Sequence, residues 1–110
     1  MRLKEKEVEL GYLYLTTANQ YRAVLAMNGG FMIYAPSLEG TAQLNLNSTK
    51  MPFENMPFKK CQIATFAKKD YQVSDFNGAE AIKHKLNESQ LAEIIAQCNA
   101  KSAMAVLLTE

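Results

Sequence analysis

The sequence predicts an α+β fold: a small, strongly bent antiparallel sheet, or a partial SH3-like barrel, with one or two C-terminal helices packed on it. Two observations support this class. A glycine-containing turn, Asn28-Gly29-Gly30, joins two apolar runs near the N-terminus, and the last third of the chain has apolar residues at helical spacing. With 110 residues, 48% of them hydrophobic, the chain can build one core. We therefore expect a single domain over residues 1–110, mainly β over 8–66 and mainly helical over 79–100.

The first strand is expected at Val8–Leu15, where alternate residues are apolar from Val8 to Tyr14. Gly11 would cost a helix about 1 kcal/mol relative to alanine, whereas in a strand a glycine can mark a bend. The short polar segment Thr16–Gln20 then predicts a loop that leads into the next strand.

A β-hairpin is predicted from Tyr21–Met27 and Phe31–Tyr34, separated by Asn28-Gly29-Gly30. A type I′ turn needs positive φ at both central residues, and Asn-Gly adopts these angles at little steric cost. Centring the turn on Asn-Gly pairs Leu25 with Met32. Centring it on the two glycines shifts that register, and the sequence leaves both options open.

The middle of the chain alternates between loop and strand signals. Pro36 should end the second hairpin strand, because proline has no N–H to donate. A short strand is expected at Ala42–Leu46 and another at Cys61–Phe66, where apolar and polar residues alternate. Between them, Lys50–Lys60 carries a repeated Met-Pro-Phe triplet, and its two prolines predict a loop with apolar anchors.

The C-terminal part predicts helices. Ala79–Leu86 contains good helix formers, and Asn87 with Gln90 three residues later resembles a capping box. A helix should therefore run from Glu88 to about Ala100, whereas Ala103–Leu108 could extend it or form a final strand. The apolar stripe of this helix consists of Leu91, Ile94, Ile95 and Cys98. We expect that stripe to pack on the sheet face that carries Leu25, Met32 and Tyr34.

Few residues point to catalysis or metal binding. His84 is the only histidine and lies between two lysines, so an exposed surface position is expected. One histidine and two distant cysteines do not match the four closely spaced ligands of structural zinc. Asp70 and Asp75 lie in a polar, turn-rich stretch and are expected to be solvated. We predict no catalytic residue, no metal site and no cofactor.

The two cysteines, Cys61 and Cys98, lie in apolar surroundings. Because the N-terminus does not resemble a secretion signal, they are expected to be buried free thiols in a cytoplasmic protein. No stretch approaches the roughly 20 apolar residues of a membrane span. An enzyme that uses one of the thiols is a third hypothesis for function, behind two binding functions.

The segment Lys50–Lys69 is the strongest candidate for binding, because it combines aromatic rings, methionines and lysines. The chain carries 12 basic and 11 acidic residues, which argues against nucleic-acid binding driven by bulk charge. The candidate protein-binding residues are Met51, Phe53, Met56, Phe58, Lys59 and Lys60. The alternative, a nucleic-acid site with a ring that stacks on bases, consists of Lys50, Lys59, Lys60, Phe66, Lys68 and Lys69. A third interpretation is that the rings tuck under the loop as structural anchors.

The order of features over about half the chain resembles small SH3-like β-barrel modules of bacterial and mobile-element proteins. The resemblance rests on Glu9–Tyr14, a polar loop, Tyr21–Leu25 and the glycine-turn hairpin ending in Ile33-Tyr34, with Ile63–Phe66 as a closing strand. It implies no functional residues. The predicted function is a non-enzymatic protein-interaction module, and a homodimer through the hairpin edge or the terminal segment is a further expectation.

Overall fold

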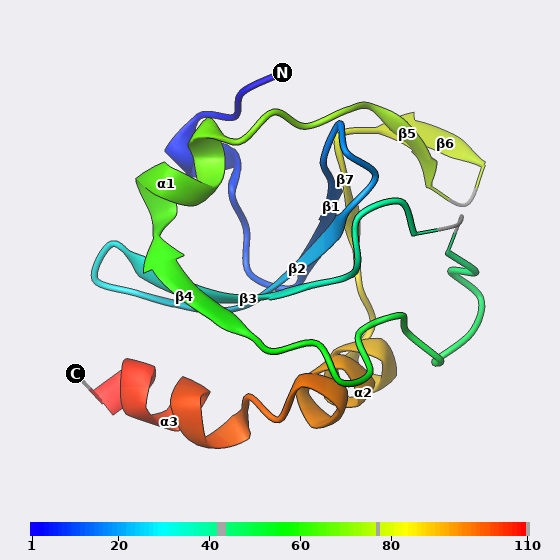
Figure 1. Cartoon of the computed structure of the whole chain (residues 1–110). Coiled ribbons are helices and arrows are strands. Elements are labelled where there is room, and N and C mark those ends of the chain that lie inside the picture. The colour runs from blue at the N-terminus through cyan, green and yellow to red at the C-terminus, as the bar shows by residue number, and fades with distance from the viewer. Residues whose placement is uncertain (42–43, 77, 110) are drawn as a thin grey trace.

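The computed structural model describes residues 1–41, 44–76 and 78–109, and these form an α+β fold (Figure 1). A five-stranded antiparallel sheet has the strand order β4-β3-β2-β1-β7, and β5 and β6 form a separate two-stranded sheet. The strands are β1 (Tyr12–Leu15), β2 (Tyr21–Asn28), β3 (Phe31–Pro36), β4 (Lys59–Gln62), β5 (Ser74–Phe76), β6 (Ala79–Ala81) and β7 (Lys83–Lys85). The helices are η1 (Glu5–Glu7, a 3-10 turn), α1 (Ile63–Lys68), α2 (Glu88–Cys98) and α3 (Lys101–Thr109). The predicted α+β class is confirmed.

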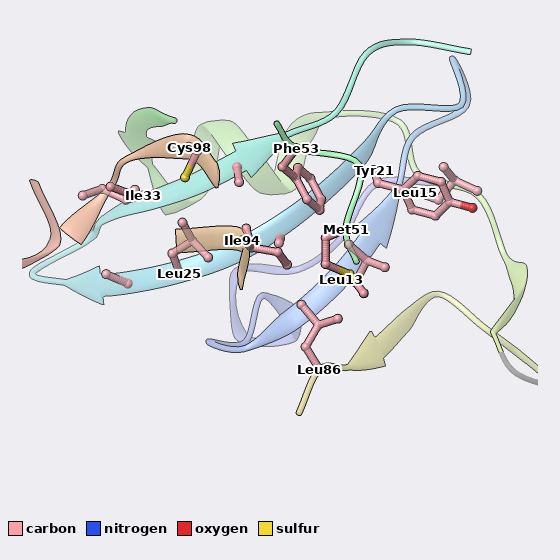
Figure 2. Packing of buried hydrophobic residues seen from close by; sticks show 14 of the residues in the cluster. Leu13, Leu15, Tyr21, Leu25, Ile33, Met51, Phe53, Leu86, Ile94 and Cys98 are labelled. Carbon is pink, nitrogen blue, oxygen red and sulfur yellow. The ribbon is translucent and has the colours of Figure 1, made fainter. Parts of the chain in front are cut away.

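The large sheet is covered on both faces, and the described residues form a cluster of buried side chains on each. Helices α2 and α3 lie along one face, and α1 lies on the other side with η1 (Figure 1). Ile94 and Cys98 of α2 pack with Leu13, Leu25 and Ile33 of the sheet in the first cluster (Figure 2). The second cluster is rich in aromatic rings and contains Tyr14, Tyr34, Phe66 and Tyr71.

The predicted hairpin is confirmed, but the register with Asn28 and Gly29 at its centre is wrong. Asn28 pairs with Phe31, so the turn is centred on Gly29 and Gly30, whose φ angles are 60° and 85°. A glycine has no Cβ and adopts these left-handed angles readily. Asn28 instead extends the strand, and its side-chain amide donates a hydrogen bond of 2.8 Å to the carbonyl of Leu107 in α3.

This register also changes the predicted packing of α2. The pairing shifts between Val24 and Ala26, and Met32 lies opposite Met27 rather than Leu25. Met32 and Tyr34 therefore belong to the second cluster, on the face away from α2. The expectation that the helix packs on Leu25 is confirmed, and the expectation that it also packs on Met32 and Tyr34 is wrong, because alternate strand residues point to opposite faces.

The first strand is shorter than the predicted Val8–Leu15. It begins at Tyr12, because Gly11 adopts a φ of 83° that turns the chain into the strand. Leu10 is 53% exposed, so the alternation seen in the sequence does not extend to it.

Two predicted strands of the middle segment differ in the structure. Of Ala42–Leu46, residues 42 and 43 lie outside the described residues, and Leu44–Leu46 is not in a strand. The Cys61–Phe66 strand is wrong: β4 ends at Gln62 and α1 follows. Gln62 pairs with Phe31, the first residue of β3, so a longer β4 would run past its partner. The amide of Ile63 donates instead to the carbonyl of Gly30 at 2.8 Å, and the chain turns into α1. The closing strand that the SH3-like resemblance placed at Ile63–Phe66 is therefore a helix.

The predicted helix over Ala79–Leu86 is also wrong, because these residues form β6 and β7. β7 pairs with β1, placing His84 opposite Leu13, and supplies the hydrogen-bonding partner that β1 lacks on that side. Pairing with a distant strand outweighs the modest helix preference of this segment.

The predicted cap at Asn87 is confirmed. The Asn87 carboxamide oxygen accepts from the amide of Gln90 at 2.8 Å, and the Gln90 side chain accepts from the amide of Asn87 at 3.1 Å. Helix α2 ends at Asn99, whose φ is 56°, and the tail forms a separate helix, α3. Within the described ranges, no single helix is long and apolar enough to cross a membrane. Helices α2 and α3 together have the length and apolar composition of a membrane span, but the chain bends by 102° between them.

Candidate functional site

The first Met-Pro-Phe triplet anchors the loop that precedes β4. Met51 is 4% exposed and Phe53 is fully buried, and both belong to the first core cluster beneath α2 (Figure 2). The amide of Phe53 donates to the side-chain oxygen of Gln97 on α2 at 3.1 Å. These two candidate partner-binding residues therefore contact the protein's own interior, as the structural-anchor interpretation expects.

The second triplet and the lysines that follow lie nearer the surface. Met56 is half-buried, and Phe58 is half-buried against the first core cluster. Lys59 is exposed on β4, which is an edge strand of the sheet, and the Lys60 ammonium lies 5.7 Å from the centre of the Phe31 ring. Lysines on an edge strand also discourage pairing with another strand, so they have a structural explanation as well.

The structure does not bring the candidate nucleic-acid residues onto one surface. Phe66 is 1% exposed, and its ring lies 5.5 Å from that of Tyr14 and 5.1 Å from that of Tyr34. A ring enclosed in this way cannot stack on a base. Lys68 and Lys69 are exposed at the end of α1, whereas Lys50 lies beside α2, on the other side of the sheet (Figure 1).

Two surface hollows lie where the anchored loop meets α2. Their volumes are about 380 and 630 Å³, and both are lined by Lys50, Glu54 and Gln97. The larger hollow continues along α2 to Glu93 and Ala96. The two hollows share three lining residues and therefore adjoin each other, and together we call them the loop–helix groove.

A third hollow, of about 590 Å³, lies in the angle between α2 and α3, and we call it the elbow hollow. Its lining is mostly apolar and consists of Ala92, Ile95, Ala96, Asn99, Lys101 and Met104. On α3, Val106 and Leu108 are 57% and 58% exposed. The apolar residues of Ala103–Leu108 were visible in the sequence. Whether they are exposed depends on the bend between α2 and α3, which the sequence does not show.

Neither thiol has the environment of an activated nucleophile. Cys98 is buried and Cys61 is half-buried, and both are free. Burial raises the pKa of both thiols, and the positive charge of Arg22 only partly offsets this effect at Cys61. A raised pKa keeps a thiol protonated at neutral pH, and only the thiolate is a good nucleophile.

His84 is half-buried, so the expectation of an exposed surface position is wrong. As part of β7, its ring stacks on Phe76 with the two centres 5.7 Å apart, and burial lowers its pKa. Asp70 and Asp75 are exposed, as predicted: Asp70 pairs with the N-terminal ammonium group, and Asp75 accepts from the amide of Gly78 at 2.8 Å. The described residues contain no group of three or more potential metal ligands.

Sequence reasoning missed an aromatic cage around Arg22 on the α1 side of the sheet. The guanidinium carbon of Arg22 lies 4.8 Å from the centre of the Tyr34 ring and 5.7 Å from that of Phe66. The Nη1 group of Arg22 donates a hydrogen bond of 3.4 Å to the Tyr71 hydroxyl, and burial raises the pKa of that hydroxyl well above its usual value. These contacts stabilise the second cluster.

A comparison of the chain with protein-family models, with curated proteins and with solved structures found no match.

Proposed function

We propose that this chain is a non-enzymatic protein-interaction module, of the kind carried by small bacterial or mobile-element proteins, and that the loop–helix groove is its docking site. One observation carries the proposal: the loop on one side of the groove is held by two buried anchors. Met51 and Phe53 reach into the core, and Gln97 binds the loop to α2. The backbone that carries the groove residues Lys50 and Glu54 is therefore held in place before a partner arrives, which lowers the entropy cost of binding.

The groove has the mixed chemistry of a protein interface. Lys50 supplies a positive charge, Glu54 and Glu93 supply negative charges, and Met51 and Pro52 add apolar surface. Interfaces commonly combine an apolar centre with a charged, solvent-exposed rim. The half-buried Met56 and Phe58 belong to the same loop, and a methionine side chain adapts to the shape of its partner.

A binding function also agrees with the state of the reactive side chains. The two thiols have raised pKa values, and the ring of His84 stacks on that of Phe76. General acid–base and thiol catalysis both need a reactive group whose protonation state can change near neutral pH.

A charge reversal in the groove tests the proposal. Tagged wild-type chain is used to recover its partner, and Lys50→Glu is compared with Lys69→Glu, an equal change at an exposed lysine on the opposite side of the sheet. We expect Lys50→Glu to reduce recovery of the partner about tenfold, corresponding to about 1.4 kcal/mol, and Lys69→Glu to leave it unchanged.

Equal melting temperatures of the three proteins would show that the fold is intact. Undiminished recovery by Lys50→Glu would contradict the groove as the docking site. A loss confined to Lys69→Glu, together with binding that weakens steeply with salt, would favour the nucleic-acid alternative.

A further inference from the structure

The outer face of α2 and α3 is an apolar surface that the described part of the chain does not cover. The elbow hollow opens on this face between Ile95 of α2 and Met104 of α3. Leu108, four residues after Met104 and therefore on the same side of α3, is 58% exposed. An exposed apolar face with a hollow at its centre is typical of an interaction surface.

The side of α2 next to this hollow allows another helix to approach closely. Ser89, Ala92, Ala96 and Asn99 are all exposed and follow one another at intervals of three and four residues. They therefore form a continuous stripe along the helix. Side-chain size sets how near two helix axes can come, and the short side chains of this stripe permit a close approach.

Opposite charges lie at the two ends of this stripe. Glu88 is exposed at the first residue of α2, and Lys101 is exposed just past its end, on the lining of the elbow hollow. Within residues 1–41, 44–76 and 78–109, neither side chain has an ion-pair partner. The stripe is therefore negative at one end, apolar in the middle and positive at the other end.

Such a stripe is complementary to a second copy of itself in the antiparallel direction. If a twofold axis passes midway between Ala92 and Ala96, Ala92 of one copy faces Ala96 of the other. The same axis places Ser89 opposite Asn99 and brings Glu88 close to Lys101 of the second copy. Symmetry makes this contact twice. A parallel arrangement would instead bring like charges together, which is unfavourable.

We propose that this chain forms a symmetric homodimer through the outer face of α2 and α3, with the two α2 helices antiparallel and the elbow hollows filled by side chains of the opposite copy. A stable dimer buries roughly 800 Å² on each partner, about an eighth of this chain's accessible surface of 6251 Å². The two helices extend along one side of a molecule whose longest dimension is 38 Å (Figure 1).

The dimer does not depend on the proposed docking function, although Ala96 borders both surfaces. In the described sheet the hairpin β2–β3 has no free edge for a second copy, because β1 pairs with β2 and β4 pairs with β3. The two edge strands, β4 and β7, are short and carry lysines, which repel a second copy in edge-to-edge pairing.

The test is the molar mass of the full chain in solution, measured by light scattering and sedimentation over a range of concentrations. We expect the wild-type chain to be a dimer at about 100 μM. A measurement at this concentration detects dimers with dissociation constants up to the same order. Ala92→Glu should raise the dissociation constant at least 100-fold and yield a folded monomer. Ala18→Glu, the same change at an exposed alanine in the loop between β1 and β2, should leave the dimer intact.

Charge exchange tests the antiparallel arrangement itself. Glu88→Lys and Lys101→Glu should each weaken the dimer about tenfold or more, since each places like charges together. The double variant should restore the dimer. A wild-type monomer at this concentration, an intact dimer in Ala92→Glu, or failure of the double variant to restore dimerisation would each overturn the proposal. Lys50→Glu should leave the molar mass unchanged, so failure of the docking proposal is distinguishable from failure of the dimer.

Discussion

The segments Lys50–Lys69 and Glu88–Thr109 each differ from what their sequences indicate in which apolar residues they bury. The first segment interleaves rings and lysines, as a binding surface does, yet Met51, Phe53 and Phe66 are buried. The second begins as an ordinary amphipathic core helix, yet α2 and α3 leave an apolar hollow open to solvent. The difference shows that apolar residue type alone does not separate an anchor from a docking residue.

The cause lies in what each segment packs against. The Lys50–Lys69 segment crosses from one side of the sheet to the other, so its rings enter both core clusters. Helices α2 and α3 cover one face of the sheet, and α2 also borders the anchored loop, so each helix buries one side and exposes the other. A helix that covers a sheet face always has an outer surface, and that of α3 carries little charge.

The largest effect is expected at the buried side of α2. Ile94 is fully buried in the first cluster, and Ile94→Asp would place a carboxylate among apolar side chains. The penalty is comparable to the net stability of a small domain, which is about 5–15 kcal/mol. We expect the cooperative thermal transition followed by circular dichroism to disappear. Ala92→Asp, on the exposed side of the same helix, should retain that transition; a near-normal melting temperature for Ile94→Asp would reject the packing of α2.

A smaller effect should separate the two Met-Pro-Phe triplets. Phe53 is fully buried, and Phe53→Ala should lower the free energy of unfolding by about 3–5 kcal/mol. Phe58 is half-buried, and Phe58→Ala should cost less than half as much. Urea denaturation of both variants measures the difference. Equal costs would mean that the second triplet is as firmly anchored as the first.

The smallest effect is a difference in the rate at which a thiol reagent labels the two cysteines, one of which lies in each segment. Cys98 of α2 is buried, and Cys61 of β4 is half-buried. At neutral pH we expect Cys61 to react with a thiol reagent more slowly than a free cysteine, and Cys98 to react only when the protein opens. Because burial raises the pKa of Cys61, its thiolate fraction and labelling rate should rise about tenfold per pH unit between pH 7 and 8.

Mass spectrometry of peptides from the labelled protein assigns the reaction to one cysteine or the other. Rapid labelling of Cys98 in the folded protein, at the rate of a free thiol, would revive the thiol-enzyme hypothesis.

Sequence was sufficient where the signal lies in a few neighbouring residues. The glycine turn of the hairpin, the Asn87–Gln90 cap and the proline-containing loop were all predicted, since turns, caps and prolines constrain the backbone directly. The α+β class followed from these local signals and the change in apolar spacing along the chain. The sequence also indicated the two candidate binding segments, the Lys50–Lys60 loop and the C-terminal segment. Both contain more apolar residues than a single strand or helix needs to bury.

Tertiary structure alone decided which of these residues reach the surface. Ala79–Leu86 is a pair of strands because β1 needs a neighbour, and β4 stops at Gln62 because β3 offers no further partner. Phe53 and Phe66 are anchors because the sheet places a core on each of its faces. The elbow hollow lies where the chain bends by 102° between α2 and α3. Each outcome depends on contacts between residues far apart in the chain, and local propensity does not contain that information.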